Sequence, residues 1–222
     1  MGHDTLKLVA DFGDPAVTIP AVLVLLAWFV VRGAHRLALA WLSALALCAV
    51  AVVASKIAFE ACGGALGLAS LRSPSGHVAG AAVLYGALAV VVGAGDRRRL
   101  AAAGAAAGVL VTAIAAARVL QNYHTASESA AGIAIGAASA LWFARWHRRT
   151  PTGRSHWGWA AAAVVAAVAF TYGGHVNFEP RILRVAKQVH WGVAACRDGD
   201  PGSRVRHAGL RPSPRGGGEG RP

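Results

Sequence analysis

Six long apolar runs dominate this sequence, and charged or turn-forming residues separate them. A helix that crosses the hydrocarbon core of a bilayer, about 30 Å thick, needs roughly 17 to 25 mostly apolar residues. Each run has this length, and the six cover residues 15–31, 37–59, 78–95, 100–117, 126–144 and 157–174. The sequence therefore predicts an all-α fold, a six-transmembrane-helix bundle over residues 15–174.

The composition supports a membrane location. Hydrophobic residues make up 55% of the chain, charged residues only 14%, and the mean hydropathy is +0.48, a balance that departs from that of an average soluble domain. Several runs are rich in Ala and Gly, which let helix backbones approach one another closely. We therefore expect the bundle to be tightly packed.

The loops alternate in charge. Arginines cluster after the first, third and fifth runs, and basic loops of this kind tend to stay in the cytoplasm. The opposite face then holds an extracytoplasmic leader at 1–14, the loop at 61–77 and the turn at 121–125. We predict an integral protein of a bacterial inner (plasma) membrane, with its site facing the periplasm or exterior.

The C-terminal part is basic. The chain has 22 Lys and Arg against 10 Asp and Glu, a formal charge of +12, and nine of the basic residues follow Phe178. Binding to nucleic acid would need a basic face interleaved with aromatic residues, and no such stretch exists outside this tail. The bilayer is therefore the expected partner. Residues 175–196 have the spacing of an amphipathic interfacial helix, or of an ordinary cap on the bundle. The composition of residues 197–222 predicts a disordered tail. Because the number of spans is even, this tail would lie on the extracytoplasmic side.

The string Arg72-Ser73-Pro74-Ser75-Gly76-His77 lies directly before the third apolar run. Pro74, Ser75 and Gly76 turn the chain so that the free N–H groups at the helix start point outward, and a helix N-terminus readily binds phosphate. His77 would stand at the edge of that site. The alternative is that the string only caps the start of the helix and that His77 is an interfacial histidine without a role in binding phosphate.

A second polar group surrounds the turn between the fourth and fifth runs. Ionisable side chains at membrane depth are costly, so Arg118 and Glu128 need partners, and a phosphate would partner Arg118. His124 and Glu128 are four residues apart, so the carboxylate can accept the imidazole Nδ1–H and leave Nε2 free to attack. The alternative is that Glu128 and Arg118 form a structural ion pair and that His124 only caps a helix. Lys56 is a third phosphate-compatible residue, although a lone lysine there can also snorkel.

Together, Lys56, Pro74-Ser75-Gly76-His77 and the Arg118, His124 and Glu128 spacing resemble the signature of the type 2 phosphatidic acid phosphatase superfamily. These membrane lipid phosphatases are related in fold to vanadium haloperoxidases. Ala117 and Glu128 stand where the family has Ser and Asp, and Gly63-Gly64 stands where it has Arg-Pro. Arg72 is the candidate to replace that arginine.

The resemblance implies a mechanism. His124, oriented by Glu128, attacks phosphorus and forms a phosphohistidine, while His77 protonates the leaving oxygen and then activates water. The phosphate would be held by cationic side chains and N–H groups at Lys56, Arg72, Ser75, Gly76 and Arg118. No metal or other cofactor is required, and the substrate would be a membrane lipid phosphate such as phosphatidic acid, phosphatidylglycerol phosphate or a polyprenyl pyrophosphate.

Two alternatives remain. His77, His124 and Glu128 could ligate a metal in a metal-dependent hydrolase, or the protein could be a non-catalytic lipid-binding or carrier protein. Cys62 and Cys196 would both face outside, where an oxidising compartment would allow a disulfide. We expect the other histidines to be solvated or interfacial; they are His3, His35, His147, His156, His175, His190 and His207.

Overall fold

The computed structural model describes residues 3–62, 73–150 and 157–176, together with the single residues 182, 184, 185 and 188. All regular structure in these residues is helical. Seven helices follow one another along the chain: α1 (His3–Asp11), α2 (Pro15–Val31), α3 (His35–Cys62), α4 (Gly76–Val92), α5 (Arg97–Leu120), α6 (Ala126–Arg149) and α7 (Trp157–Thr171). Six of them match the six apolar runs, which confirms the all-α bundle, whereas α1 was not predicted.

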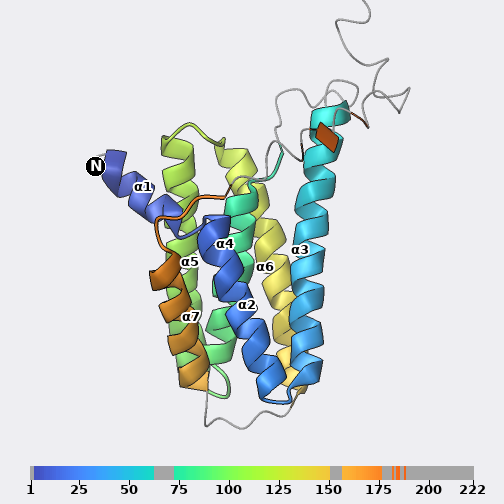
Figure 1. Cartoon of the computed structure of the whole chain (residues 1–222), viewed down its shortest axis with the longest axis vertical. Coiled ribbons are helices and arrows are strands. Elements are labelled where there is room, and N and C mark those ends of the chain that lie inside the picture. The colour runs from blue at the N-terminus through green and yellow to red at the C-terminus, as the bar shows by residue number, and fades with distance from the viewer. Residues whose placement is uncertain are drawn as a thin grey trace, which may run out of the picture.

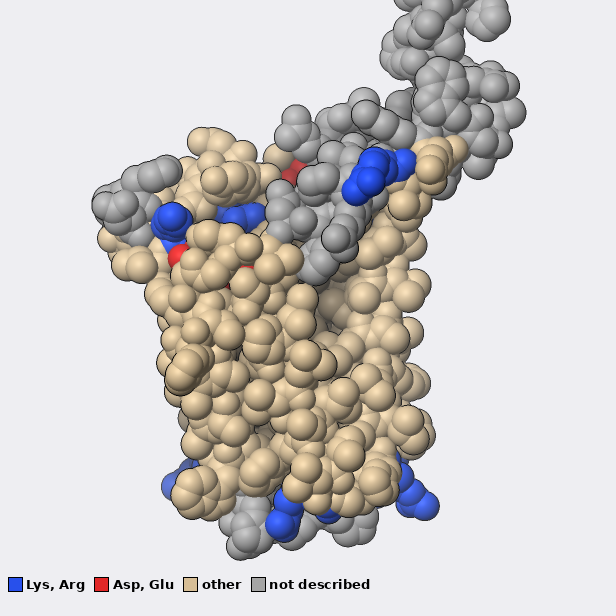
Figure 2. All heavy atoms as spheres, in the orientation of Figure 1, with Lys and Arg blue, Asp and Glu red and all other residues tan. Residues whose placement is uncertain are grey.

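Helices α2 to α7 run alternately up and down, side by side (Figure 1). At the upper end in this view lie α1, the end of α3, the start of α4, the turn between α5 and α6 and the end of α7. The turns after α2 and α4 and the arginine-rich last turn of α6 lie at the opposite end. Figure 2 shows charged side chains at both ends and an uncharged band between them. This distribution fits a bundle that crosses a bilayer.

Length and composition agree with a membrane location. Among the described residues, three helical stretches are long and apolar enough to cross a bilayer: Thr5–Val31, His35–Phe59 and Arg97–Leu120. Two shorter apolar helices cover Gly76–Val92 and Gly158–Thr171. Helix α6 is more polar, because Glu128 lies in its first turn and His147, Arg148 and Arg149 lie in its last.

Side-chain caps explain where several helices begin. Asp14 precedes α2 and accepts a hydrogen bond from the Ala16 N–H at 2.8 Å. Asp96 accepts from the N–H groups of Arg98 and Arg99, so α5 begins three residues before the apolar run starts. Such caps satisfy N–H groups that have no partner within the helix.

The tight packing expected from the Ala and Gly content is present where α4 crosses α6. A Cβ added at Gly132 would lie 2.6 Å from the Ser75 carbonyl oxygen, and one at Gly136 would lie 2.4 Å from the Ala79 carbonyl oxygen. A side chain cannot be accommodated at either distance. Glycine at these two positions therefore brings the start of α4 against the first three turns of α6.

Several predictions fall outside the described residues. These are the position of Arg72, the pairing of Cys62 with Cys196, the basic tail and most of the interfacial segment at 175–196. They stay predictions from the sequence.

Candidate active site

His124 and Glu128 are joined at the start of α6. The His124 Nδ1 lies 2.8 Å from Glu128 Oε2, and the Glu128 side chain is 2% exposed. The same oxygen accepts a hydrogen bond from the Thr125 N–H at 3.1 Å, while the Thr125 hydroxyl accepts from the Glu128 N–H at 3.3 Å. This reciprocal capping box fixes the carboxylate, and the carboxylate in turn orients the imidazole as the spacing of four residues suggests.

The loop before α4 is tied to the same helix start. The Ser75 N–H donates to the Glu128 carbonyl oxygen at 3.0 Å, and Gly132 lets the two backbones meet. Residues separated by about fifty positions in the sequence are therefore held together at one end of the bundle. As a result, His77 in the first turn of α4 lies on the same side as His124.

Arg118 connects the two histidine regions. One of its terminal nitrogens, Nη2, lies 3.4 Å from His77 Nδ1. Its guanidinium carbon lies 4.7 Å from the centre of the Tyr123 ring, in cation–π contact. This planar cation is thus held in place beside His77, at the end of α5.

Lys56 on α3 belongs to the same group of charges. Its side chain is buried, with 5% of the residue exposed, so it does not snorkel into solvent. Burial lowers the pKa of the His124 imidazole below its usual value, and the charges of Arg118 and Lys56 lower it further, against the opposing effect of Glu128. His124 is therefore neutral at neutral pH, the form in which an imidazole is a nucleophile.

The start of α4 has the features of an anion site. Ser75 is the N-cap residue, but its side chain makes no capping hydrogen bond, so it does not occupy the first N–H groups of the helix. The Ser75 hydroxyl and the second Glu128 oxygen, Oε1, are both buried without a hydrogen-bond partner among the described residues. Buried polar atoms of this kind are rare in folded proteins and usually have an explanation in function.

The sequence reasoning missed Asp14 and His175. Asp14 Oδ2 lies 3.7 Å from His77 Nε2 and 3.3 Å from His175 Nδ1, and Asp14 Oδ1 accepts from the Val176 N–H at 3.1 Å. Asp14 is 7% exposed and joins the start of α2, the start of α4 and the segment after α7. The available signal was an aspartate directly before a proline at the start of an apolar run, a pattern typical of a helix start.

A cavity of about 300 Å³ opens beside these residues. Its lining is polar and of mixed charge: Lys7, Ala10, Asp11, Asp14, Arg118, Gln121, Tyr123 and His175. Arg118 and Asp14 therefore face both the histidines and this cavity. Within the described ranges, no three His, Cys, Asp or Glu residues form a group that could hold a metal ion.

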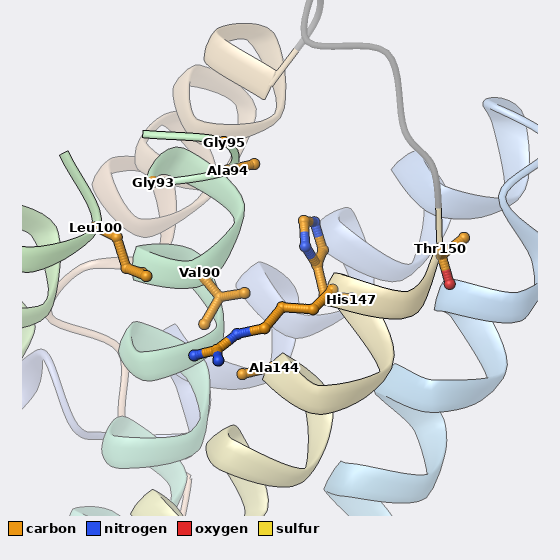
Figure 3. A pocket seen from close by; sticks show the side chains of 9 residues that line it. Val90, Gly93, Ala94, Gly95, Leu100, Ala144, His147 and Thr150 are labelled. Carbon is orange, nitrogen blue, oxygen red and sulfur yellow. The ribbon is translucent and has the colours of Figure 1, made fainter. Parts of the chain in front are cut away.

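A second polar cavity, of about 340 Å³, lies at the opposite end of the bundle, between the turn after α4 and the end of α6. Figure 3 shows the imidazole of His147 pointing from α6 into it. His147 is only 6% exposed, and its ring packs against Phe143. His147 is therefore buried rather than solvated, because α6 continues beyond the apolar run and keeps this residue on its buried face, at the arginine-rich end of the bundle.

Comparisons with known proteins identify a family. The model of the PAP2 superfamily, the type 2 phosphatidic acid phosphatases, matches residues 58–151, a segment that contains His77, Arg118, His124 and Glu128. A similar protein is the uncharacterized 22.5 kDa protein in the cps region of Klebsiella pneumoniae, 31% identical over 176 residues, which are 76% of this chain and 83% of that protein. No solved structure matches the chain significantly.

Proposed function

Because the chain belongs to the PAP2 superfamily, whose members are generally phosphatases, we propose that it is an integral membrane phosphatase that hydrolyses a phosphomonoester or pyrophosphate of a lipid. The reaction would proceed through a phosphohistidine on His124. The observation that carries this proposal is the hydrogen bond from His124 Nδ1–H to the buried Glu128 carboxylate, beside Arg118 and His77.

The neighbours of the two histidines favour opposite tautomers. A carboxylate only accepts hydrogen bonds, so Glu128 places the proton of His124 on Nδ1 and leaves a lone pair on Nε2. A guanidinium only donates, so the Arg118 contact with His77 Nδ1 favours a lone pair there and the proton on Nε2. His124 is thereby prepared as a nucleophile. His77 presents an N–H at Nε2 and would act as an acid in its imidazolium form, which the Asp14 carboxylate 3.7 Å from Nε2 would stabilise.

The proposed chemistry has two steps. In the first, His124 Nε2 forms a bond to phosphorus, the bond from phosphorus to the leaving oxygen breaks, and His77, as an imidazolium protonated on both nitrogens, gives its Nε2 proton to that oxygen and becomes neutral. In the second, His77 takes a proton from water as the water oxygen attacks phosphorus. The P–N bond then breaks, and inorganic phosphate leaves with His124 restored.

Charge on the phosphoryl oxygens would be stabilised by Arg118, Lys56 and the N–H groups at the start of α4, near Ser75 and Gly76. Arg72 is proposed as a further cation for the same group on the sequence evidence alone. We place the site on the periplasmic or exterior side, because the arginine-rich loops lie at the other end of the bundle.

The test is phosphate release by the purified protein from phosphatidic acid, phosphatidylglycerol phosphate and a polyprenyl pyrophosphate. We expect His77→Ala to reduce kcat by about 10² to 10⁴-fold, the usual effect of losing a positioned acid or base, and His124→Ala to reduce it further. Substrate labelled in the phosphoryl group should leave label on the wild-type chain after alkaline quenching, and none on His124→Ala. If His124→Ala released phosphate at the wild-type rate, the proposed mechanism would be wrong.

A further inference from the structure

An apolar groove of about 350 Å³ lies between α4, α5 and α6, the three helices that carry His77, Arg118 and His124. Its outer edges are exposed residues, Gly104, Gly108 and Thr112 on α5 and Ala137 and Leu141 on α6. The groove therefore opens sideways, at the depth of the hydrocarbon core of the membrane.

The floor of the groove is formed by α4. Small side chains or none lie there, at Ala82, Gly86 and Ala89. Among the described lining residues, Thr112 is the only one with a polar side chain. Apart from the Thr112 hydroxyl, such a surface offers dispersion contacts rather than hydrogen bonds, which suits a hydrocarbon chain.

The groove is aligned with the candidate active site. Thr112, at its upper end, is six residues below Arg118 on the same helix, a distance of about 9 Å along the axis. From Thr112 the groove continues to Leu100, about 18 Å further, toward the opposite face of the membrane. A lipid whose phosphate lies at Arg118 would extend its chain along this path.

The dimensions favour a linear chain over a helix from another subunit. A volume of about 350 Å³ over a length of about 18 Å gives a mean cross-section on the order of 20 Å². A helix at least about 10 Å across has roughly four times that cross-section. Gly104 and Gly108 have the four-residue spacing of a helix-association motif, so a second copy of the chain is the competing occupant.

We propose that this groove binds one hydrocarbon chain of the lipid substrate and aligns its phosphate with His124, an inference that rests on the proposed function. A chain in the bilayer is already out of water, so the groove gains little from the hydrophobic effect. Its contribution is to position the substrate, which enters sideways from the membrane between α5 and α6.

Gly108→Leu is the variant that tests the groove. No atom lies within 4 Å of a Cβ added at Gly108, so leucine fills the groove without displacing the bundle. Gly158→Leu on α7 is the matched control, because a Cβ there also meets no atom within 4 Å and Gly158 is outside the groove. Both variants are assayed on two matched pairs: dioleoyl and dibutanoyl phosphatidic acid, and undecaprenyl and isopentenyl pyrophosphate.

We expect Gly108→Leu to lower the ratio of kcat/KM for the long-chain substrate to that for its short-chain partner at least tenfold, and Gly158→Leu to leave this ratio unchanged. An unchanged ratio in Gly108→Leu would overturn the proposal. So would a change from dimer to monomer in Gly108→Leu, since the groove would then be a contact between copies of the chain.

Photo-crosslinking separates this inference from the proposed function. A phosphatidic acid with a diazirine near the end of one acyl chain, added to His124→Ala, should label residues 100–112 of α5 or 133–144 of α6. This labelling does not depend on turnover. If the wild type released no phosphate, the proposed function would be wrong, but the labelling would still test whether the groove binds the lipid chain. Labelling confined to other helices would show that the chain does not bind in this groove.

Discussion

The crossing of α4 and α6 holds the start of α4 against His124 and Glu128, so Gly132→Ala should disturb the site without touching a reactive group. The added Cβ would lie 2.6 Å from the Ser75 carbonyl oxygen, whereas ordinary contact begins at 3.4 Å. The two helix backbones must therefore separate by about 0.8 Å at this point. Both contacting atoms belong to rigid elements, so no side chain can relieve the clash.

The magnitude follows from that displacement. A misplacement of about 1 Å in an active site can cost about 10²-fold in rate, and overpacking of a closed interface typically destabilises a protein by about 1–3 kcal/mol. We expect kcat/KM for phosphate release to fall 10 to 100-fold. Helix propensity acts in the opposite direction, because alanine favours a helix by up to about 1 kcal/mol over glycine.

The assay pairs phosphate release with thermal unfolding in detergent. Gly158→Ala is the control, because it makes the same chemical change in a helix and its Cβ meets no atom within 4 Å. We expect the control to keep wild-type activity with an equal or higher melting temperature. If Gly132→Ala matched the control in both measurements, close packing of α4 on α6 would not be what positions the site.

Three other predictions concern the charged groups. Burial lowers the pKa of His124, while the Glu128 carboxylate raises it, so the acid limb of log kcat/KM should lie at a pH below the usual imidazole pKa. Glu128→Gln removes the raising effect and should move this limb to lower pH while reducing kcat, and a limb that moved to higher pH would contradict the pairing. Asp14→Asn should lower kcat about tenfold, roughly 1.4 kcal/mol of transition-state stabilisation, with little change in KM; an increase in KM alone would assign Asp14 to substrate binding. Phosphate release should persist in EDTA, and its loss with restoration by a divalent cation would favour the metal-dependent alternative.

The fold could be predicted because membrane insertion places strong demands on sequence. Each apolar run had to be long enough to cross the bilayer, and each became a helix within a few residues of the expected bounds. The differences at the ends have local causes. Asp96 extends α5 by capping it three residues early, and α1 escaped notice because nine residues that include three charges carry no transmembrane signal.

Parts of the candidate site could also be predicted, where spacing within one helix determines geometry. The four-residue interval between His124 and Glu128 was enough to expect their hydrogen bond. Contacts between distant segments were not accessible in this way. The position of Asp14 beside His77 depends on how α2, α4 and the segment after α7 meet, and no periodicity in the sequence encodes that meeting.

Asp14 completes a pattern that would explain how the two histidines take the different roles proposed for them. Each has a buried carboxylate beside it, but Glu128 lies 2.8 Å from His124 on the nitrogen away from the substrate, whereas Asp14 lies 3.7 Å from His77 on the nitrogen proposed to donate its proton. A nucleophile must keep one tautomer throughout, which a short hydrogen bond from a capped helix start enforces. An acid that later acts as a base must release and recover a proton, which a longer contact permits. Asp14 lies before the segment matched by the family model, so this part of the candidate site comes from the region that precedes that segment.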